Sequence, residues 1–404
     1  MRVVVLGTGK IASGYLAPLF RAAGWDVVLA GRTPAVVDRI QAAPAYTVRT
    51  TGPSAGTVEV RGVRGVRIGS PAFEQAVAGS DLVCVCVGVG AVTSVAAPLA
   101  AALSTRDPAR PLDVWTVEND DVADLLDSAV RRAAGSRPLP LLRVAGAVAH
   151  VAVARGSWHD SPAPEFVGDG ATRLYVDATG LTTPFPDLPG VQATPVYPAR
   201  LREKLYVFNA GHAICAYLGW LRGHATIAEA VRDPFLRPMV AGCLLESRRA
   251  LLQVHPQLGD DLHGPVVEAL QRYADDELAD PVVRVAREPL RKLAPADRLL
   301  GPLRMVHEQT GKEPPYFSLG VAGALLYRGD DGEQTRELRA RLGRDGVRAV
   351  LEQVCGLAVT DPFSESVAAR YAGFVLLPDE TVFPPAHTSA GVVGSTPVLP
   401  LAAS

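Results

Sequence analysis

The sequence begins with MRVVVLGTGKIASGYLAPLF (residues 1–20), in which an apolar run leads into glycines and then into a helical pattern. The apolar run is typical of a buried strand, and residues 11–23 carry helical periodicity. Between them, Gly7 and Gly9 permit a tight turn and let backbone N–H groups approach a phosphate at the positive end of the helix. Ala12 fills the third position of a G-x-G-x-x-A pattern, where only a small residue packs. The stretch therefore predicts a dinucleotide-binding unit.

The following residues alternate strand and helix patterns. Apolar strand patterns occur at 26–31, 81–88 and 111–119, and a capped helix pattern occupies 120–135. After Pro198 the pattern becomes helical at 201–222, 224–232, 235–254, 263–273, 295–310, 315–328 and 332–355. This order predicts an α/β fold, a Rossmann-type doubly wound sheet domain followed by an all-helical C-terminal domain.

Three boundaries follow from this pattern. We expect the sheet domain at 1–197, the helical substrate domain at 198–375 and a tail at 376–404. The sequence of this tail lacks helix or strand periodicity and contains several prolines. Within the first domain, residues 57–70 alternate Val with Arg or Gly and predict an inserted hairpin. Residues 158–200 are rich in Pro, Gly, Asp and Thr, and predict a linker that crosses between the domains.

Composition excludes several classes of partner. The net charge of −2 and the charged content of 20% give no electrostatic reason to expect nucleic acid or an acidic membrane surface. The five cysteines are scattered without the spacing of a metal site, so we expect reduced thiols and no metal. No secretory signal precedes the first strand pattern, and no apolar run reaches the ~18 residues of a membrane span. We expect a soluble cytoplasmic protein, a monomer or small homo-oligomer, that acts on small molecules.

The end of the second strand selects the cofactor. An acidic residue there would accept hydrogen bonds from a ribose 2′-hydroxyl, but the sequence has LAGRTP, with Arg32 and Thr33 able to hold a 2′-phosphate. NADP(H) is therefore favoured, with NAD(H) as the alternative. The candidate cofactor-binding residues lie in the glycine loop and after later strands: Gly7, Gly9, Lys10, Ile11, Gly14, Arg32, Thr33, Val87, Gly88 and Asn119.

A second motif, KLYVFNAGH at 204–212, places three polar residues in an otherwise apolar helix pattern. The chain has only four lysines against 36 arginines, so Lys204 is unusual. Lysine, unlike arginine, becomes a general acid or base near neutral pH when burial and nearby cations lower its pKa. At α-helical spacing, Asn209 lies about 140° from Lys204, with His212 between them. All three are expected to face one cleft.

These residues suit the interconversion of an alcohol and a ketone. Lys204 would take the hydroxyl proton as hydride leaves, the amide of Asn209 would stabilise the developing alkoxide, and His212 would bind a neighbouring hydroxyl.

The segment from 204 to 234 resembles the polyol-specific long-chain dehydrogenases, and within them the mannitol-1-phosphate 5-dehydrogenase branch, through its K-x-x-x-x-N-x-x-H signature. The resemblance extends to PLRKL and DRL within 272–303, to GTGKIASGYL and to VENDD. It implies that Lys204 is the catalytic acid/base, that Asn209 and Asn119 form the oxyanion-stabilising pair, and that His212 holds the substrate. It also implies that no metal is needed.

A group of cations predicts where a phosphate would bind. Arg284, Arg287, Arg291, Lys292 and Arg298 suit the mouth of a cleft that receives a sugar phosphate. Arg287, Arg291 and Lys292 are the candidate substrate-binding members, with His212.

The sequence also departs from the pattern of this branch. Residues 144–156, which include His150, differ from the acidic and basic residues expected there, and no acidic residue follows the second strand. The expected substrate is therefore a polyol phosphate or a cyclitol phosphate.

Two other functions fit the same features. One is a ketopantoate-reductase-like 2-keto acid reductase, which also joins such a sheet to helices carrying Lys and Asn. The K-x-x-x-x-N-x-x-H interval and PLRKL argue against it. The other is a non-catalytic NADP(H)-binding sensor, which would bind cofactor without turnover.

Overall fold

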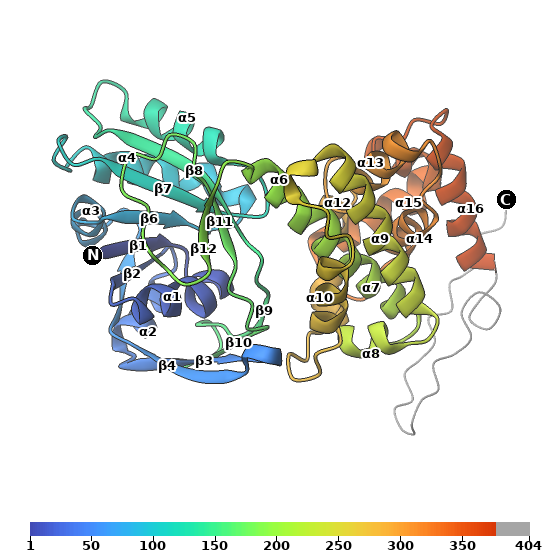
Figure 1. Ribbon diagram of the computed structural model, residues 1–404, viewed down its shortest axis with the longest axis horizontal. Helices are drawn as coiled ribbons and strands as arrows, with labels where there is room; N and C mark the ends of the chain where they lie inside the picture. The colour runs from blue at the N-terminus through green and yellow to red at the C-terminus, as the bar shows by residue number, and fades with distance from the viewer. Residues whose placement is uncertain (377–404) are drawn as a thin grey trace.

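The computed structural model describes residues 1–376, which form two domains side by side along the long axis of the molecule (Figure 1). A sheet domain comes first and a helical domain follows, so the predicted fold class is confirmed. The predicted tail at 376–404 lies, apart from its first residue, outside the described residues.

The sheet domain is built on one eight-stranded sheet, in the order β12-β11-β8-β7-β6-β1-β2-β5. The run from β8 to β5 is parallel, whereas β11 is antiparallel to β8. The strands are β1 (Arg2–Leu6), β2 (Asp26–Gly31), β5 (Val63–Arg67), β6 (Leu82–Val85), β7 (Leu112–Val117), β8 (Leu142–Ala149), β11 (Leu174–Asp177) and β12 (Val191–Thr194). Most of their side chains are buried because both faces of the sheet are covered.

The two faces have different covers. Apolar residues of α3 (Pro71–Ala78), α4 (Ala96–Leu103) and α5 (Ala123–Ala134) form the core on one face. The other face packs against the helix after the glycine loop, which consists of a π-helical part, η1 (Ala12–Leu16), and α1 (Ala17–Ala22), and against α2 (Pro34–Ala42). Beyond these helices lies a four-stranded sheet of β4 (Gly56–Arg61), β3 (Ala45–Thr50), β10 (Glu165–Gly168) and β9 (Val153–Arg155).

The predicted hairpin at 57–70 is wrong. Its two halves form strands that belong to different sheets: β4 pairs antiparallel with β3, and β5 pairs parallel with β2. Gly65 suits the position of β5 beside β2, because a Cβ there would come within 2.8 Å of the carbonyl oxygen of Val37 in α2. The residue lets α2 lie close to the edge of the main sheet.

The predicted linker at 158–200 is also more ordered than expected. It contributes β10 to the small sheet and β11 and β12 to the large one, before α6 (Tyr197–Arg202) leads into the second domain. Tyr197 joins the two parts, because its ring lies so close to Gly146 of β8 that a Cβ there would come within 2.3 Å of it.

The second domain is entirely helical within the described residues. Its helices continue from α6 through the π-helical segment η4 (Glu203–Phe208) to α7 (Asn209–Leu221), α8 (Ile227–Arg232), α9 (Leu236–Val254), the short 3-10 turn η5 (Pro256–Leu258), α10 (Gly264–Tyr273), α11 (Val282–Ala286), α12 (Pro289–Lys292), α13 (Leu300–Thr310), α14 (Pro315–Leu326), α15 (Glu333–Gln353) and α16 (Pro362–Leu376). Helix α7 is central and packs against α8, α9, α11 and α14. Among residues 1–376, no helix combines the length and apolarity needed to cross a membrane.

Candidate active site

The carboxyl ends of the central parallel strands bring the predicted cofactor residues to one edge of the sheet. Gly7 follows β1, Gly88 follows β6 and Glu118 follows β7, and the Gly88 N–H donates to Glu118 Oε1 at 2.8 Å. In open α/β sheets, ligands bind at this edge.

The glycine loop fits a dinucleotide. Gly7 has a φ of +132°, and a Cβ there would lie 2.5 Å from the Cys86 carbonyl oxygen, so only glycine is accommodated. Gly9 is exposed, and no atom lies within 4 Å of where its Cβ would be, which leaves the backbone open to a pyrophosphate. These two glycines would hold the pyrophosphate.

The other predicted residues of this region are placed differently. Lys10 and Ile11 begin the helix after the loop, and Lys10 Nζ donates to the Ala154 carbonyl oxygen. Gly14 is buried away from the open loop, where a Cβ would meet Val153 of β9 at 2.8 Å. Its small size therefore serves packing between helix and small sheet.

The residues that would select the cofactor are exposed. Arg32 and Thr33 follow β2, and Thr33 precedes α2 without capping it through its side chain. Both side chains are therefore available at the edge of the sheet. Val87 and Gly88 lie at the same edge, after β6.

Lys204 and Asn209 are joined by a π-helical turn. The backbone N–H of Asn209 donates to the Lys204 carbonyl oxygen, five residues earlier, instead of to the residue four earlier. The wider turn places Asn209 five residues and one hydrogen-bonded turn after Lys204, so the ideal α-helical spacing behind the expected angle of about 140° does not apply to this segment. Such turns are frequent at functional sites.

The environment of Lys204 suits proton transfer near neutral pH. The residue is 8% exposed, and burial is the main cause that lowers its pKa from 10.5 to about 7. The charges of Arg272 and Arg298 lower the pKa further, whereas Asp169 and Glu118 raise it. The amine is thus a candidate general acid/base.

His212 lies one turn after Asn209 and faces a buried carboxylate. Its Nε2 lies 3.2 Å from Asp280 Oδ2, and burial, against the effect of Asp280, lowers the pKa of His212 and so favours the neutral ring. Because the carboxylate accepts, Nε2 carries the proton and Nδ1 is left as an acceptor. Tyr273 stacks on the ring, with centroids 5.0 Å apart and planes 8° apart. His212 is therefore held in one orientation.

Glu118 is a site residue that the sequence analysis did not select. It is 8% exposed, and burial raises its pKa from 4.5 to about 7, against the hydrogen bonds from Gly88 and Val87 and the charge of Lys204. The predicted Asn119 follows it and is exposed. The sequence does contain an indication of Glu118, because a carboxylate is unusual at the end of a buried strand, directly before Asn119.

The predicted phosphate cluster divides into paired and unpaired cations. Arg291 binds Glu288 at 2.7 Å and Asp297 at 3.5 Å. Buried Lys292 donates to the Arg287 carbonyl oxygen, and burial lowers its pKa well below 10.5. The guanidinium of Arg287 is exposed and has no carboxylate within 4.0 Å among the described residues.

Arg287 faces the cofactor loop. The pKa of Lys10 is lowered from 10.5 to about 8, mainly by burial and in part by the charges of Arg284 and Arg287. Arg284 itself is held by Asp280. The charges of Arg284, in α11, and of Arg287, after it, therefore act on the glycine loop across the domain boundary. In the part of the chain from 1 to 376, no group of three or more His, Cys, Asp or Glu residues is arranged to hold a metal ion.

Comparison with known proteins identifies similar domains in the same order. The model of the mannitol dehydrogenase Rossmann domain matches residues 1–135, and that of the mannitol dehydrogenase C-terminal domain matches residues 199–374. Over 373 residues, the chain is 27% identical to the mannitol-1-phosphate 5-dehydrogenase of Bacillus pumilus (strain SAFR-032), covering 91% of this chain and 98% of that protein.

Solved structures share the fold. A mannitol 2-dehydrogenase of Pseudomonas fluorescens, in ternary complex with NAD and D-mannitol, superposes with a TM-score of 0.74 at 16% identity, covering 92% of this chain and 91% of that one. A D-sorbitol dehydrogenase in substrate-free form superposes with a TM-score of 0.69 at 14% identity, covering 92% and 93%.

Proposed function

Because the chain belongs to the mannitol dehydrogenase family, we propose that it is an NAD(P)-dependent oxidoreductase that interconverts a secondary alcohol and a ketone on a polyol phosphate or cyclitol phosphate. The observation that carries the proposal is a buried lysine with a pKa of about 7, one π-helical turn from Asn209 and close to the carboxyl end of β7. The curated relative, which acts on mannitol 1-phosphate by its name, supports a phosphorylated substrate.

The proposed chemistry assigns a role to each polar residue. In the oxidative direction, neutral Lys204 takes the hydroxyl proton, while the amides of Asn209 and Asn119 donate to the developing oxyanion. The Nδ1 atom of His212 accepts from a neighbouring hydroxyl. A nicotinamide dinucleotide held at Gly7 and Gly9 would supply or accept the hydride.

The substrate phosphate is assigned to Arg287 and Lys292, with Arg291 beside them. A phosphate brings about two negative charges, and Arg287 has no carboxylate partner in the described part of the chain. Lys292 is buried next to it. An anionic substrate would therefore balance the charge of Arg287, which has no carboxylate partner among the described residues.

Arg287→Ala is expected to raise KM for a phosphorylated ketose by about 10–100-fold, the worth of a charge-assisted hydrogen bond, with little change in kcat. Arg291→Ala is the matched comparison, and we expect a smaller effect because Glu288 and Asp297 already hold that guanidinium. Initial rates over a range of substrate concentrations measure both. Equal KM values for wild type and the Arg287 variant would remove this residue from the phosphate site.

Arg32→Asp is expected to shift the cofactor preference, measured as the ratio of kcat/KM with NADPH to that with NADH, toward NADH by about 10–100-fold. The aspartate would repel a 2′-phosphate and accept from a 2′-hydroxyl. Arg132→Asp, on the exposed face of α5, is the control for a change of charge alone. An unchanged ratio in the Arg32 variant would show that Arg32 does not contact the 2′-phosphate.

The function itself is tested by following the oxidation of NADPH and NADH with fructose 6-phosphate, free fructose and a panel of keto-cyclitol phosphates. Turnover with a phosphorylated ketose or cyclitol, and weaker turnover with the free ketose, is the expected result. Turnover of 2-keto acids instead would favour the keto acid reductase. Tight binding of NADPH without turnover of any compound would favour the sensor.

A further inference from the structure

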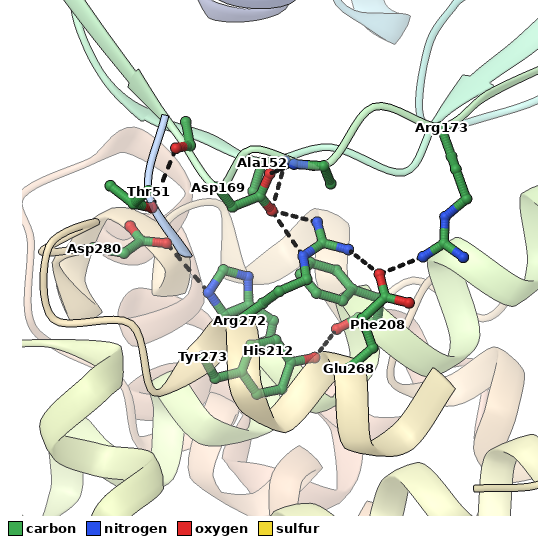
Figure 2. Close-up of polar contacts among 12 residues, drawn as sticks. Thr51, Ala152, Asp169, Arg173, Phe208, His212, Glu268, Arg272, Tyr273 and Asp280 are labelled. Carbon is green, nitrogen blue, oxygen red and sulfur yellow. Dashed lines mark hydrogen bonds and ion pairs between the residues drawn. The ribbon is translucent and has the colours of Figure 1, made fainter. Parts of the chain in front are cut away.

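Arg272, near the end of α10, reaches out of the helical domain to a carboxylate of the sheet domain. Its Nε lies 2.8 Å from Asp169 Oδ2, and its Nη2 also donates to that oxygen (Figure 2). Asp169 lies in the connection from β10 to β11, and its side chain is 1% exposed. The pair thus joins the two domains through a nearly dry contact.

The carboxylate is held in place by its own domain. Asp169 Oδ2 accepts from the Ala152 N–H at 3.1 Å, and Oδ1 accepts from the Ala171 N–H at 3.2 Å. The Asp169 N–H donates in turn to the Ala152 carbonyl oxygen at 3.0 Å. The acceptor that Arg272 meets is therefore held by hydrogen bonds within its own domain.

On its other side, Arg272 contacts the helix turn that carries the candidate catalytic residues. Its guanidinium lies 4.0 Å from the centre of the Phe208 ring, and the hydroxyl of Tyr273 donates to the Phe208 carbonyl oxygen. Phe208 is the last residue of the π-helical segment, directly before Asn209. The same two residues of α10 thus contact this turn and, through the stacked Tyr273 ring, His212 (Figure 2).

The contact also closes one side of the site. The cavity between the domains here has about 10 Å³ and is lined by His212, Phe208, Arg272, Tyr273 and Asp280, among others. That is room for about one water molecule. With the pair formed, little room for water remains on this side of His212, whose side chain is 12% exposed.

We propose that Arg272 is a positioning residue, which holds the sheet domain against the helix turn of Lys204 and Asn209 through Asp169 on one side and Phe208 on the other. The inference rests on the assignment of Lys204 under the proposed function. Arg272 would then act on Lys204 from the neighbouring helix α10. The site would be complete only when the two domains pack together.

The proposal has an electrostatic consequence with a definite sign. The largest charge effects on Lys204 come from Arg272 of α10, Arg298 before α13, Asp169 after β10 and Glu118 after β7, and the charge of Lys204 acts in turn on His150 after β8. Removing the positive charge of Arg272 should raise the pKa of Lys204, and removing the negative charge of Asp169 should lower it. A pair that served packing alone would give no such opposite responses.

The small number of lysines makes this measurable without any substrate. In protein labelled with [ε-¹³C]lysine, only four ε-carbon signals are present, and Lys204→Arg identifies the one of interest. Titration of that signal gives the pKa of Lys204 in wild type, Arg272→Met and Asp169→Asn. We expect the pKa to rise by about 1 in the first variant and to fall by about 1 in the second. Arg272→Lys, which keeps the charge, should restore most of the wild-type value.

A matched control breaks the neighbouring contact between the domains. Arg173 pairs across the same boundary with Glu268, whose Oε1 also lies 3.4 Å from Arg272 Nη1, but Arg173 is not among the largest charge effects on Lys204. Arg173→Met should therefore shift the pKa of Lys204 much less than Arg272→Met does. If Arg272→Met does not fold, the Arg272→Met/Asp169→Asn double variant removes both charges together, and its pKa should fall between those of the single variants.

Equal pKa values in all variants, or shifts of Arg272→Met and Asp169→Asn in the same direction, would overturn the proposal. This readout stands even if no substrate is turned over, so its failure and that of the proposed function are distinguishable. Where turnover is found, kcat of Arg272→Met should fall by about 10²-fold, because a small misplacement of the reacting groups is costly. An unchanged kcat in a variant with an altered pKa would limit Arg272 to an electrostatic influence and overturn its positioning role.

Discussion

Lys204→Met is expected to lower turnover by about 10²–10⁴-fold in both directions, the usual range for a lost general acid or base. Methionine keeps much of the stem that fills the buried site but cannot exchange a proton. The loss should appear mainly in kcat, because Asn209, His212 and the glycine loop would still bind substrate and cofactor. Steady-state rates with the best substrate of the panel give the comparison.

Lys312→Met is the matched control. Lys312 is exposed after α13, so the same change there should leave kcat within a factor of about two, as is usual for surface positions. Thermal unfolding of both variants checks that the chain still folds. A Lys204 variant with near-normal kcat would remove Lys204 from the proton transfer.

The pH dependence of the reaction rates should report the protonation of Lys204. Oxidation of the alcohol needs neutral Lys204, so kcat/KM in that direction should rise as the pH passes through about 7, the pKa of the buried amine. Reduction of the ketone needs protonated Lys204, so its rate should fall over the same range. Glu118, with a pKa of about 7, titrates in the same window. Glu118→Gln therefore tests which group the profile reports.

The sequence predicted features that depend on neighbours along the chain. The glycine loop follows β1 as expected, and the strands at 26–31 and 111–119 correspond to β2 and β7, because a buried parallel strand needs an unbroken apolar run. The long amphipathic or apolar helix patterns correspond likewise to α9 and α14. Lys204 stands out in the sequence because lysine can exchange a proton near neutral pH and because the whole chain has only four lysines.

Features that depend on distant partners were not predicted. The alternation at 57–70 predicts strands but not the strands with which they pair. In the structure, β4 pairs with β3 in the small sheet and β5 pairs with β2 in the large one. The π-helical turn is another case, because the residues at 203–208 are compatible with an ordinary α-helix. Its wider hydrogen bond is a property of the packed segment between α6 and α7.

The same limit applies to the residues around Lys204. Asp169 and Arg272 lie about a hundred residues apart in the chain and meet only when the two domains pack together. Neither has a local pattern that marks it, since a GDG turn and an arginine near a helix end are both common. Their importance follows from burial and from the charge that they place beside the amine, which only the structure reveals.

Gly9→Ala and Gly7→Ala are expected to abolish cofactor binding by different routes, each raising Kd by more than about 100-fold. At Gly9 the new methyl group would meet no atom within 4 Å, so the fold should be as stable as wild type. The methyl group would instead stand where the pyrophosphate must approach the backbone. Calorimetric titration with NADPH and NADH measures the loss, and thermal unfolding shows whether stability is retained.

Gly7→Ala should lower stability as well as affinity. The Gly7 N–H donates to the Ala30 carbonyl oxygen at 2.8 Å, so the loop is tied to β2 while a new Cβ would sit 2.5 Å from the Cys86 carbonyl oxygen. Combined with a φ of +132°, this overlap should cost about 2–4 kcal/mol in the free energy of unfolding. Relieving the overlap with the Cys86 carbonyl oxygen would displace the end of β6 and, with it, the Gly88 N–H that donates to Glu118. If the Gly9 variant bound cofactor normally while the Gly7 variant lost both binding and stability, the loop would be a structural turn, because only the pyrophosphate role requires the empty space beside Gly9.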